Sequence, residues 1–341
     1  MTRKRIAIVL YNLGGPDCPE AIQPFLFNLF SDSAIIRLPN PLRWLIAKLI
    51  SKRRAPEAQE IYHHLGGRSP ILPNTEKQAQ ALQQNLENSD HDYRVFIAMR
   101  YWHPLVPEVV QKVRSYDPEE VVLVPLYPQF STTTTGSFVK CWEAEVRHQG
   151  WQVPTKSICC YPTEADFIAA HVSLIQTVTD PLNPSRYRLL FSAHGLPERI
   201  IQAGDSYQWQ VEQTAAAVVA QLNLPGLDWQ ICYQSRVGPL KWIGPSTEAE
   251  LERAIQDQKD VVLVPIAFVS DHSETLVELD IQYRQHVIDS GRNFYRVPTL
   301  GVSGAYIDAL KALIIKAHDD PRPVQGSGCP EKFGDCPCRI S

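Results

Sequence analysis

The sequence predicts an α/β protein of two similar halves, each with a parallel sheet flanked by helices. Short apolar runs rich in β-branched residues alternate with longer segments of helical character, which is the pattern of parallel strands joined by helices. The run VVLVP occurs twice, at 121–125 and at 261–265. A turn containing glycine and proline follows the first apolar run of each half, at 13–16 and at 194–197.

The elements of the first half follow from its apolar runs. The run at 5–13 is continuous, which is typical of a strand buried on both faces. A long helical stretch separates it from the next strand, so we expect an insertion at about 18–75. The predicted strands are 5–13, 93–102, 121–127 and 154–160, and the predicted helices are 20–30, 40–54, 74–88, 107–115 and 138–148.

The second half begins with a helix and a linker that contains two prolines, and then repeats the strand pattern. Its predicted helices are 163–179 and 305–317, the linker is 180–184, and the predicted strands are 187–193, 229–235, 261–265 and 293–300. We therefore expect one half at 1–162, a second half at 163–318, and a cysteine-rich tail at 319–341.

Composition narrows the class of protein. The chain has 341 residues, of which 44% are hydrophobic and 21% charged, as in ordinary globular proteins. A net charge of -4 without a basic tract gives no sign of nucleic-acid binding. The N-terminus does not resemble a secretory signal and no apolar run is long enough to span a membrane, so we expect a cytoplasmic protein.

The predicted helix at 40–54 has two interpretations. It carries an apolar face and several lysines and arginines. A basic amphipathic helix of this kind can lie on an anionic membrane surface. A helix packed against its own domain would show the same pattern, and the sequence favours neither interpretation.

The stretch 261–280 is central to the functional prediction. Pro265 is expected to end the strand, and Ser270 or Asp271 can then cap a helix that has Glu274 in its first turn. The apolar side chains expected to pack are Leu276, Leu279, Tyr283 and Val287. A strand end followed by a helix start is where open α/β sheets bind ligands.

Histidines and carboxylates gather at these predicted strand ends. His194 directly follows the strand at 187–193, and His272, Glu274 and Glu278 follow the strand at 261–265. An imidazole and two stacked carboxylates could hold a divalent metal ion or move protons. A capped, solvated helix start would contain the same carboxylates without any chemistry.

A tryptophan and a set of cysteines are further candidates. Trp242, in a loop rich in glycine and proline, could offer a flat face to a planar ligand or could simply anchor the loop. Cys329, Cys336 and Cys338 lie within ten residues of the tail, a density that suits zinc or an iron–sulfur cluster. A fourth ligand would come from Cys159 or Cys160, which could instead be small buried apolar side chains.

Seven motifs together resemble the ferrochelatases, the enzymes that insert ferrous iron into a porphyrin. They cover nearly the whole chain in the order found in that family. They are NLGGP at 12–16, GGRSPI at 66–71, RYWHP at 100–104, LVPLYPQFSTTTTGS at 123–137, FSAHGLP at 191–197, YQSRVGPLKWIGPST at 233–247 and PIAFVSDHSETLVELD at 265–280.

The resemblance implies two Rossmann-like, chelatase-like domains with a porphyrin cleft between them. His194 resembles the family histidine placed at the pyrrole nitrogens, and Glu274 resembles the carboxylate that shares the iron site. His272 and Glu278 match a path for iron or protons. The activity implied is insertion of the substrate Fe2+ into protoporphyrin IX to form protohaem, in which the cleft distorts the ring and the enzyme removes its protons.

The resemblance also suggests residues that contact the porphyrin, a membrane surface and a cluster. The porphyrin-binding candidates are Tyr11, Phe25, Leu26, Arg100, Tyr101 and Trp242. The apolar lip around Phe25, Leu26 and Trp44 touches the membrane in some members of the family. The tail spacing of Cys329, Cys336 and Cys338 resembles that of the bacterial members with a [2Fe–2S] cluster.

Three alternatives to this activity remain at the level of sequence. The porphyrin could be coproporphyrin III, or the enzyme could be a related chelatase that metallates sirohydrochlorin, although SDHSETLVELD argues against the latter. A non-catalytic carrier of haem or metal could have the same fold. An assay of metal insertion into a porphyrin separates an enzyme from a carrier.

Overall fold

The computed structural model describes residues 3–87, 89–236, 238–322, 324–326 and 328–338, and divides into two compact units. Unit 1 contains the chain up to Tyr127, Ser131–Cys160 and Leu310–Gly326. Unit 2 contains Pro128–Phe130, Tyr161–Ala309 and the described residues after Gly326. The predicted helix end at 88 and residues 323, 327 and 339–341 of the predicted tail lie outside the described residues.

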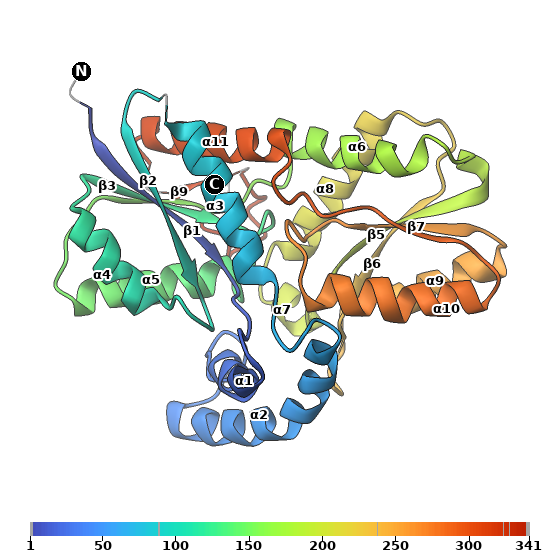
Figure 1. Ribbon diagram of the computed structural model, residues 1–341, viewed down its shortest axis with the longest axis horizontal. Coiled ribbons are helices and arrows are strands. Elements are labelled where there is room, and N and C mark those ends of the chain that lie inside the picture. Colours follow the sequence, from blue (N-terminus) through green and yellow to red (C-terminus); the bar gives the residue numbers. More distant parts are fainter. Residues whose placement is uncertain (1–2, 88, 237, 323, 327, 339–341) are drawn as a thin grey trace. The chain divides into compact units, whose positions relative to one another are not determined.

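Unit 1 is built on a parallel sheet (Figure 1). Its strands are β1 (Arg5–Asn12), β2 (Asp92–Met99), β3 (Glu120–Pro125), β4 (Thr155–Ile158) and the short β9 (Val324–Gln325). They lie in the order β2-β1-β3-β4-β9. All of β1 after Arg5 is buried, as expected for a continuous apolar run in a sheet covered on both faces.

Unit 1 also contains helices, some of which supply the apolar side chains that cover this sheet. They are α1 (Ile22–Phe30), α2 (Asn40–His63), α3 (Ile71–Leu86), α4 (Val106–Tyr116) and α5 (Thr135–His148), with the 3-10 turn η1 (Pro19–Ala21) before α1. Phe138 and Trp142 of α5 join β-branched residues of β1, β3 and α4 in one buried cluster. α11 (Gly304–Asp319) is shared by the two units.

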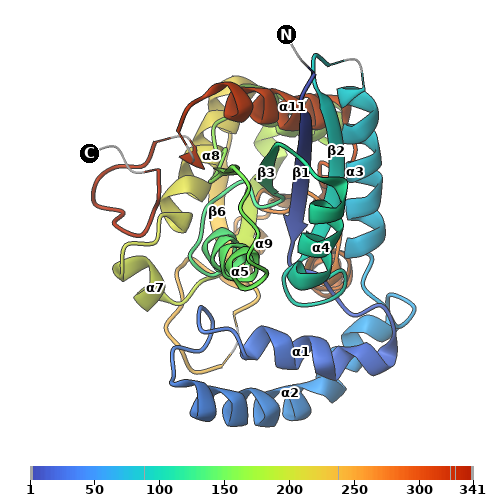
Figure 2. The same ribbon diagram turned by 90° about the vertical axis from the view of Figure 1, so that its left-hand side faces the viewer.

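α2 is longer than the sequence predicts. It packs against α1 (Figure 2) and continues past 54 to His63, with Pro56 inside it. A proline removes one backbone N–H bond and usually breaks a helix. Pro56 is exposed, whereas the preceding Ala55 is buried. The proline thus lies on the solvent side of α2, and the helix continues past it.

Unit 2 repeats the architecture with a second parallel sheet, in the order β6-β5-β7-β8. Its strands are β5 (Tyr187–His194), β6 (Trp229–Gln234), β7 (Asp260–Pro265) and β8 (Phe294–Arg296). Its helices are α6 (Ala165–Thr179), α7 (Glu198–Gln202), α8 (Tyr207–Leu222), α9 (Thr247–Gln256) and α10 (Arg284–Asp289), with the 3-10 turn η2 (Pro184–Arg186) and the π-helix η3 (Glu274–Tyr283).

The two sheets have the same topology, which confirms the predicted fold class. In each sheet the first strand of the unit lies between the second and the third, and the fourth follows the third. The two VVLVP runs form β3 and β7, each next to the first strand of its own sheet. The chain therefore forms two similar α/β halves, as the repeat indicates.

The outer edge of β2 is covered by a side chain. β2 is the last strand of its sheet, so one row of its backbone groups has no neighbouring strand. The amide of Gln83, on α3, donates from Nε2 to the carbonyl of Tyr93 at 3.0 Å and accepts at Oε1 from the N–H of Val95 at 2.9 Å. Gln83 thus makes the two hydrogen bonds that a paired strand would make there.

Candidate active site

His194 is held at the carboxyl end of the central strand β5. The residues of β5 that precede it are buried, whereas the side chain of His194 is 37% exposed. β5 pairs with β7 in parallel, so the loop after β7 leaves the sheet at the same edge. That loop carries His272 and leads into η3, which begins at Glu274.

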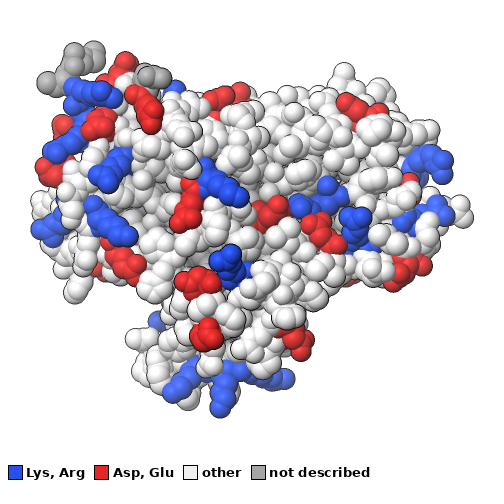
Figure 3. Space-filling view, viewed as in Figure 1, with Lys and Arg blue, Asp and Glu red and all other residues white. Residues whose placement is uncertain are grey.

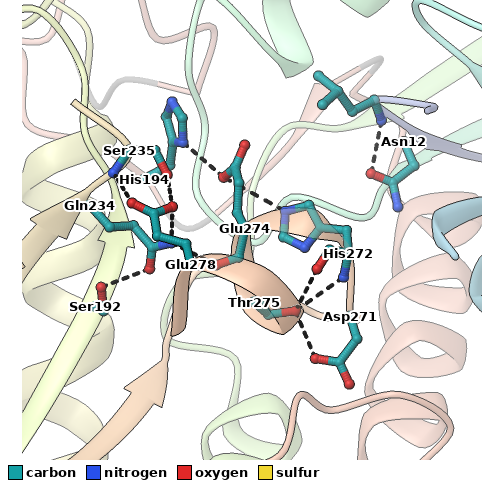
Figure 4. A network of polar contacts seen from close by, with 11 residues as sticks. Asn12, Ser192, His194, Gln234, Ser235, Asp271, His272, Glu274, Thr275 and Glu278 are labelled. Atoms are coloured by element: carbon teal, nitrogen blue, oxygen red, sulfur yellow. Dashed lines mark hydrogen bonds and ion pairs between the residues drawn. The ribbon is translucent and has the colours of Figure 1, made fainter. Parts of the chain in front are cut away.

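The structure brings His194, Glu274 and His272 together (Figure 4). His194 Nδ1 lies 2.9 Å from Glu274 Oε2. His272 Nε2 lies 3.7 Å from the same oxygen, so the carboxylate stands between the two imidazoles. The carboxylate and the two rings could pass protons among themselves, and His194 with Glu274 could contribute two ligands to a divalent cation.

The start of η3 differs from the prediction. Neither Ser270 nor Asp271 is the N-cap, because the helix begins three residues after Asp271, with Ser273 at the N-cap and no capping side chain. Asp271 instead accepts a hydrogen bond from Thr275 Oγ1 at 2.8 Å, and Thr275 Oγ1 accepts one from the N–H of His272 at 3.1 Å. These contacts fix the backbone that presents His272.

The packed face of η3 also differs in one position. Leu279, Tyr283 and Val287 are buried as predicted, but Leu276 is only half-buried and Val277 is buried in its place. A π-helix has i→i+5 hydrogen bonds and a wider turn than an α-helix. Positions predicted from α-helical spacing therefore shift near the beginning of η3.

Glu278 lies near His194 and Glu274, and hydrogen-bond donors surround its carboxylate (Figure 4). Its carboxylate accepts from the N–H of Ser235 at 2.8 Å, from Ser235 Oγ at 2.5 Å, from Gln234 Nε2 at 3.0 Å and from the hydroxyl of Tyr283 at 3.0 Å. Burial and the nearby charge of Glu274 raise the pKa of Glu278, although the bonds from Ser235 and Tyr283 oppose that rise.

Glu274 and His194 shift each other's pKa. Burial alone would lower the pKa of His194, but the charge and hydrogen bond of Glu274, with the charge of Glu278, raise it above its ordinary value. Burial alone would raise the pKa of Glu274, but His194 and then His272 hold it well below its usual range. The pair therefore favours a protonated imidazole beside an ionised carboxylate.

Trp242 lies next to the turn that follows His194. Its backbone forms a bridge with Pro197, and a Cβ added at Gly195 would come within 3.4 Å of the Trp242 ring. The same Cβ would lie 3.0 Å from the carbonyl oxygen of Gln234, a tight contact that a larger residue could make only if its neighbours shifted. Trp242 Nε1 and His272 Nδ1 are buried and have no hydrogen-bond partner within the described residues.

The porphyrin-binding candidates of unit 1 fall into two groups. Arg100 and Tyr101 both bind the buried carboxylate of Asp32, at 2.7 and 2.8 Å from its Oδ2. Tyr101, Phe25 and Leu26 are buried in one apolar cluster. Tyr11 is fully buried and its ring stacks on Phe138 at a centroid distance of 3.8 Å.

The cysteines of the tail lie in unit 2. Cys329 and Cys336 are buried with their Sγ atoms 3.2 Å apart, and Gln210 Nε2 donates to Cys329 Sγ at 3.0 Å. Cys338 is half-buried, and its carbonyl accepts from the N–H of Cys329. Cys159 and Cys160 are buried in unit 1. Within the described ranges no group of three or more His, Cys, Asp or Glu residues is arranged to hold a metal ion.

Several polar residues around the pair were not predicted from the sequence. They are Gln234, Ser235, Thr275 and Tyr283, the last of which was predicted only as a packed apolar residue. Asp32, which lies in unit 1 and binds Arg100 and Tyr101, was not predicted either. Gln234 and Ser235 end a predicted strand, and that position is the only sequence signal that could have indicated them.

Comparisons with known proteins agree with this geometry. A sequence model of the family described as Ferrochelatase matches residues 5–318. The chain is 50% identical over 343 residues to a protein of Pelagibacter ubique (strain HTCC1062) named ferrochelatase, covering 97% of this chain and 98% of that one. It is 49% identical over 349 residues to a ferrochelatase of Rickettsia bellii (strain OSU 85-389), covering 100% of this chain and 97% of that one.

Solved structures with little sequence identity share the fold. SirB from Bacillus subtilis with Fe3+ has a TM-score of 0.57 at 9% identity, over 92% of this chain and 95% of that chain. CbiX, described as the terminal enzyme of sirohaem biosynthesis in denitrifying bacteria, has a TM-score of 0.50 at 12% identity, over 92% of this chain and 99% of that chain. At these identities the likeness concerns the fold alone.

Proposed function

Because the chain belongs to the ferrochelatase family, we propose that it inserts Fe2+ into protoporphyrin IX to form protohaem. The observation that carries this proposal is the contact of 2.9 Å between His194, at the end of β5, and Glu274, at the start of the helix that follows the neighbouring strand β7. The family match indicates the class of reaction, and this contact supports the proposal that the reaction takes place at His194 and Glu274.

The chemistry of metal insertion suits these side chains. A porphyrin must lose two pyrrole protons, and a flat ring hides its nitrogens from the metal. Binding energy that bends the ring exposes the nitrogens. We propose that His194 accepts pyrrole protons, because Glu274 stabilises the imidazolium that results, and that the carboxylate of Glu274 offsets the charge of the arriving iron. Nitrogen and oxygen ligands of this kind bind Fe2+ weakly enough to release it.

His272 and Glu278 are proposed to extend this pair. His272 shares the same carboxylate oxygen of Glu274, and Glu278 lies four residues further along the same helix. Burial raises the pKa of Glu278, so this carboxylate takes up a proton more readily than an exposed glutamate does. Together they offer successive positions for protons that leave the pair or for iron that approaches it.

Contacts with the porphyrin are proposed for residues of both units. Trp242 is the candidate beside His194, since its ring packs against the glycine that follows the histidine. Arg100 is partly exposed and could bind an anionic group of the porphyrin. Tyr11, Phe25, Leu26 and Tyr101 are buried, so their proposed part is to support the binding surface from behind.

A metallation assay tests the proposed function. We expect the purified protein to insert Fe2+ or Zn2+ into protoporphyrin IX faster than into coproporphyrin III, followed by absorbance. A clear preference for coproporphyrin III would assign that substrate instead. Binding of porphyrin without any metal insertion would make the protein a carrier of haem or metal.

A variant at His194 tests the proposed proton acceptor most directly. We expect His194→Ala to lower kcat at least about 100-fold, because general acid–base groups contribute on that scale. His286→Ala is the matched control, since His286 is a half-exposed histidine of the same unit that binds only Glu252 among the ion pairs. If His194→Ala keeps more than a tenth of the turnover of His286→Ala, the role proposed for His194 is wrong.

A [2Fe–2S] cluster is proposed for the cysteines of the tail. Cys329, Cys336 and Cys338 would hold it, with Cys159 or Cys160 as the fourth ligand. The buried, adjacent sulfurs of Cys329 and Cys336, and the amide that donates to Cys329, suit thiolates that bind iron. Such a cluster would add a redox-active iron centre to the protein.

Optical spectra test the cluster. We expect protein purified without oxygen to be coloured, with iron–sulfur absorbance that is lost in Cys336→Ser and retained in Cys141→Ser. A colourless preparation with one zinc ion per chain would show that the cysteines form a zinc site.

Contact with a membrane surface is proposed for α2. Leu42, Trp44, Leu45 and Leu49 are exposed to between 48% and 69%. Basic side chains gather over α2, at the bottom of the view in Figure 3. Exposed apolar residues beside lysines and arginines are typical of helices that lie on anionic lipid. None of the described helices combines the length and apolar composition needed to cross a membrane.

A further inference from the structure

We propose that Gln234 is a positioning residue that fixes the distance between His194 and Glu274. The inference rests on the function proposed for that pair. Gln234 touches neither of the two reacting groups of the pair, and its contacts are with the backbone and with neighbouring polar side chains.

The backbone of Gln234 is tied to the turn that holds His194. Gln234 is the last residue of β6, and in the sheet it is the direct partner of His194. Its carbonyl accepts from the N–H of Gly195 at 2.8 Å. Any movement of the β5 end that displaces His194 must therefore also strain Gln234.

The side chain of Gln234 is tied to the helix that holds Glu274. Its Nε2 donates to the backbone carbonyl of Glu274 at 3.0 Å and to Glu278 Oε2 at 3.0 Å. The carboxamide is fully buried, so these bonds do not compete with water. The amide thus holds the first turn of η3 through two acceptors that lie four residues apart.

The third bond of the carboxamide sets its direction. Ser192 Oγ donates to Gln234 Oε1 at 2.8 Å and lies 3.0 Å from Thr247 Oγ1 (Figure 4). Ser192 is two residues before His194 on β5, so the two side chains leave the strand on the same face. With Oε1 facing Ser192, both N–H groups of the amide point toward η3.

Glutamine is the residue type that this arrangement requires. The position needs one acceptor and two donors, which a carboxamide supplies at the same time. A glutamate would place a second negative charge against Glu278, and an apolar side chain would leave a buried carbonyl and a buried hydroxyl with fewer partners. Gln234 therefore links the strand of His194 to the helix of Glu274 through fixed, short contacts.

The test compares two glutamines of one strand. Gln234→Met keeps the length of the side chain and removes its polar atoms. Gln230→Met is the matched control, because Gln230 is half-buried on β6 and its side chain donates to the carbonyl of its neighbour Ile231, away from the pair. Ser192→Ala is the second variant, since it leaves Gln234 in place and removes only the hydroxyl that orients the amide.

We expect Gln234→Met to lower kcat about 10- to 100-fold relative to Gln230→Met, since small misplacements of reacting groups have effects of this size. The KM for porphyrin should stay close to that of the control, because only the pair is displaced, whereas the melting temperature should fall, because a buried carbonyl and a buried hydroxyl lose a partner. Ser192→Ala should show a smaller loss in the same direction. Equal kcat values for Gln234→Met and Gln230→Met would overturn the inference, and if Gln234→Met does not fold, an unchanged kcat in Ser192→Ala would overturn it.

A second measurement separates this inference from the proposed function. Zn2+ is titrated into each substrate-free protein and into the same protein that also carries His194→Ala. The difference between the two titrations reports the Zn2+ binding that depends on His194, because both proteins keep the tail cysteines. We expect the Zn2+ affinity that depends on His194 to weaken about tenfold in Gln234→Met and to stay unchanged in Gln230→Met. If the wild-type protein metallates no porphyrin, the proposed function fails, and this titration alone decides the role of Gln234.

Discussion

Asp32 is a buried carboxylate that binds three side chains at once. Its Oδ2 accepts from Arg100 at 2.7 Å, from the hydroxyl of Tyr101 at 2.8 Å and from Ser137 Oγ at a very short distance. Burial alone would raise the pKa of Asp32, but the charge of Arg100 and these hydrogen bonds lower it below its ordinary value of 3.8. Asp32 thereby sets the orientation of Arg100, a residue proposed to bind porphyrin.

The lowered pKa of Asp32 gives a stability that depends on pH. Because the folded-state pKa is depressed, this contribution is fully present above about pH 3.8 and is lost as the pH falls through the folded-state value. We expect Asp32→Asn to cost about 3 kcal/mol in the free energy of unfolding at pH 7, since it leaves Arg100 without its partner, and the difference from wild type to shrink below pH 3.8.

Urea unfolding between pH 3 and pH 7 measures this difference. Asp117→Asn is the control, because the Arg5–Asp117 pair is exposed and such pairs contribute less than about 1 kcal/mol. A constant difference between wild type and Asp32→Asn over the whole range would contradict the assignment of the depressed pKa to Asp32.

The sequence indicates histidines and carboxylates that follow strands better than it indicates other buried polar side chains. His194, His272 and Glu274 could be predicted because histidines and carboxylates at strand ends have few purely structural roles. Gln234 and Asp32 could not, since nothing in their neighbours indicates whether an amide or a carboxylate is buried. Their partners are 40 or more residues away along the chain.

Helix α2 shows that a sequence predicts the presence of a helix more easily than it predicts where the helix ends or which face is exposed. The basic, apolar pattern correctly predicted a helix from Asn40, whereas the continuation to His63 depends on Pro56 facing solvent. The π-helix η3 shows the same limit, because the sequence predicts a helix there but does not indicate its wider turn.

The exposed face of α2 predicts binding to anionic lipid. We expect the protein to sediment with phosphatidylglycerol vesicles, and Leu45→Glu with Leu49→Glu to weaken this binding at least about tenfold, since each change removes an apolar side chain that lipid would bury. Ile288→Glu, at an exposed position of α10, is the control. Equal sedimentation of the two variants would exclude α2 as the contact.

The whole molecule repeats one topology but not one chemistry. The proline that ends each VVLVP run pairs with Tyr11 in the first sheet and with Ser192 in the second. Two residues further along, the first half has Leu13 where the second has His194. The repeat therefore predicts the architecture of both halves, whereas only the individual residues at the strand ends indicate which half carries the proposed iron site.

The last strand of the first sheet could not be predicted. β9 has two residues and pairs with β4, and it lies in the segment that the sequence indicates only as a tail. A strand so short has no hydrophobic period, so its position depends on the rest of unit 1. The larger strands, whose apolar runs are continuous, were predicted to within a few residues.

The hydrogen bonds of Gln83 have a consequence for solubility. An open strand edge is a template on which a second molecule can add its own strand, and the carboxamide occupies that template at Tyr93 and Val95. We expect Gln83→Leu to form aggregates with increasing concentration, detected by light scattering, whereas Gln84→Leu on the exposed side of α3 stays dispersed. The carboxamide of Gln83 would then prevent the sheets of two molecules from pairing at the edge of β2.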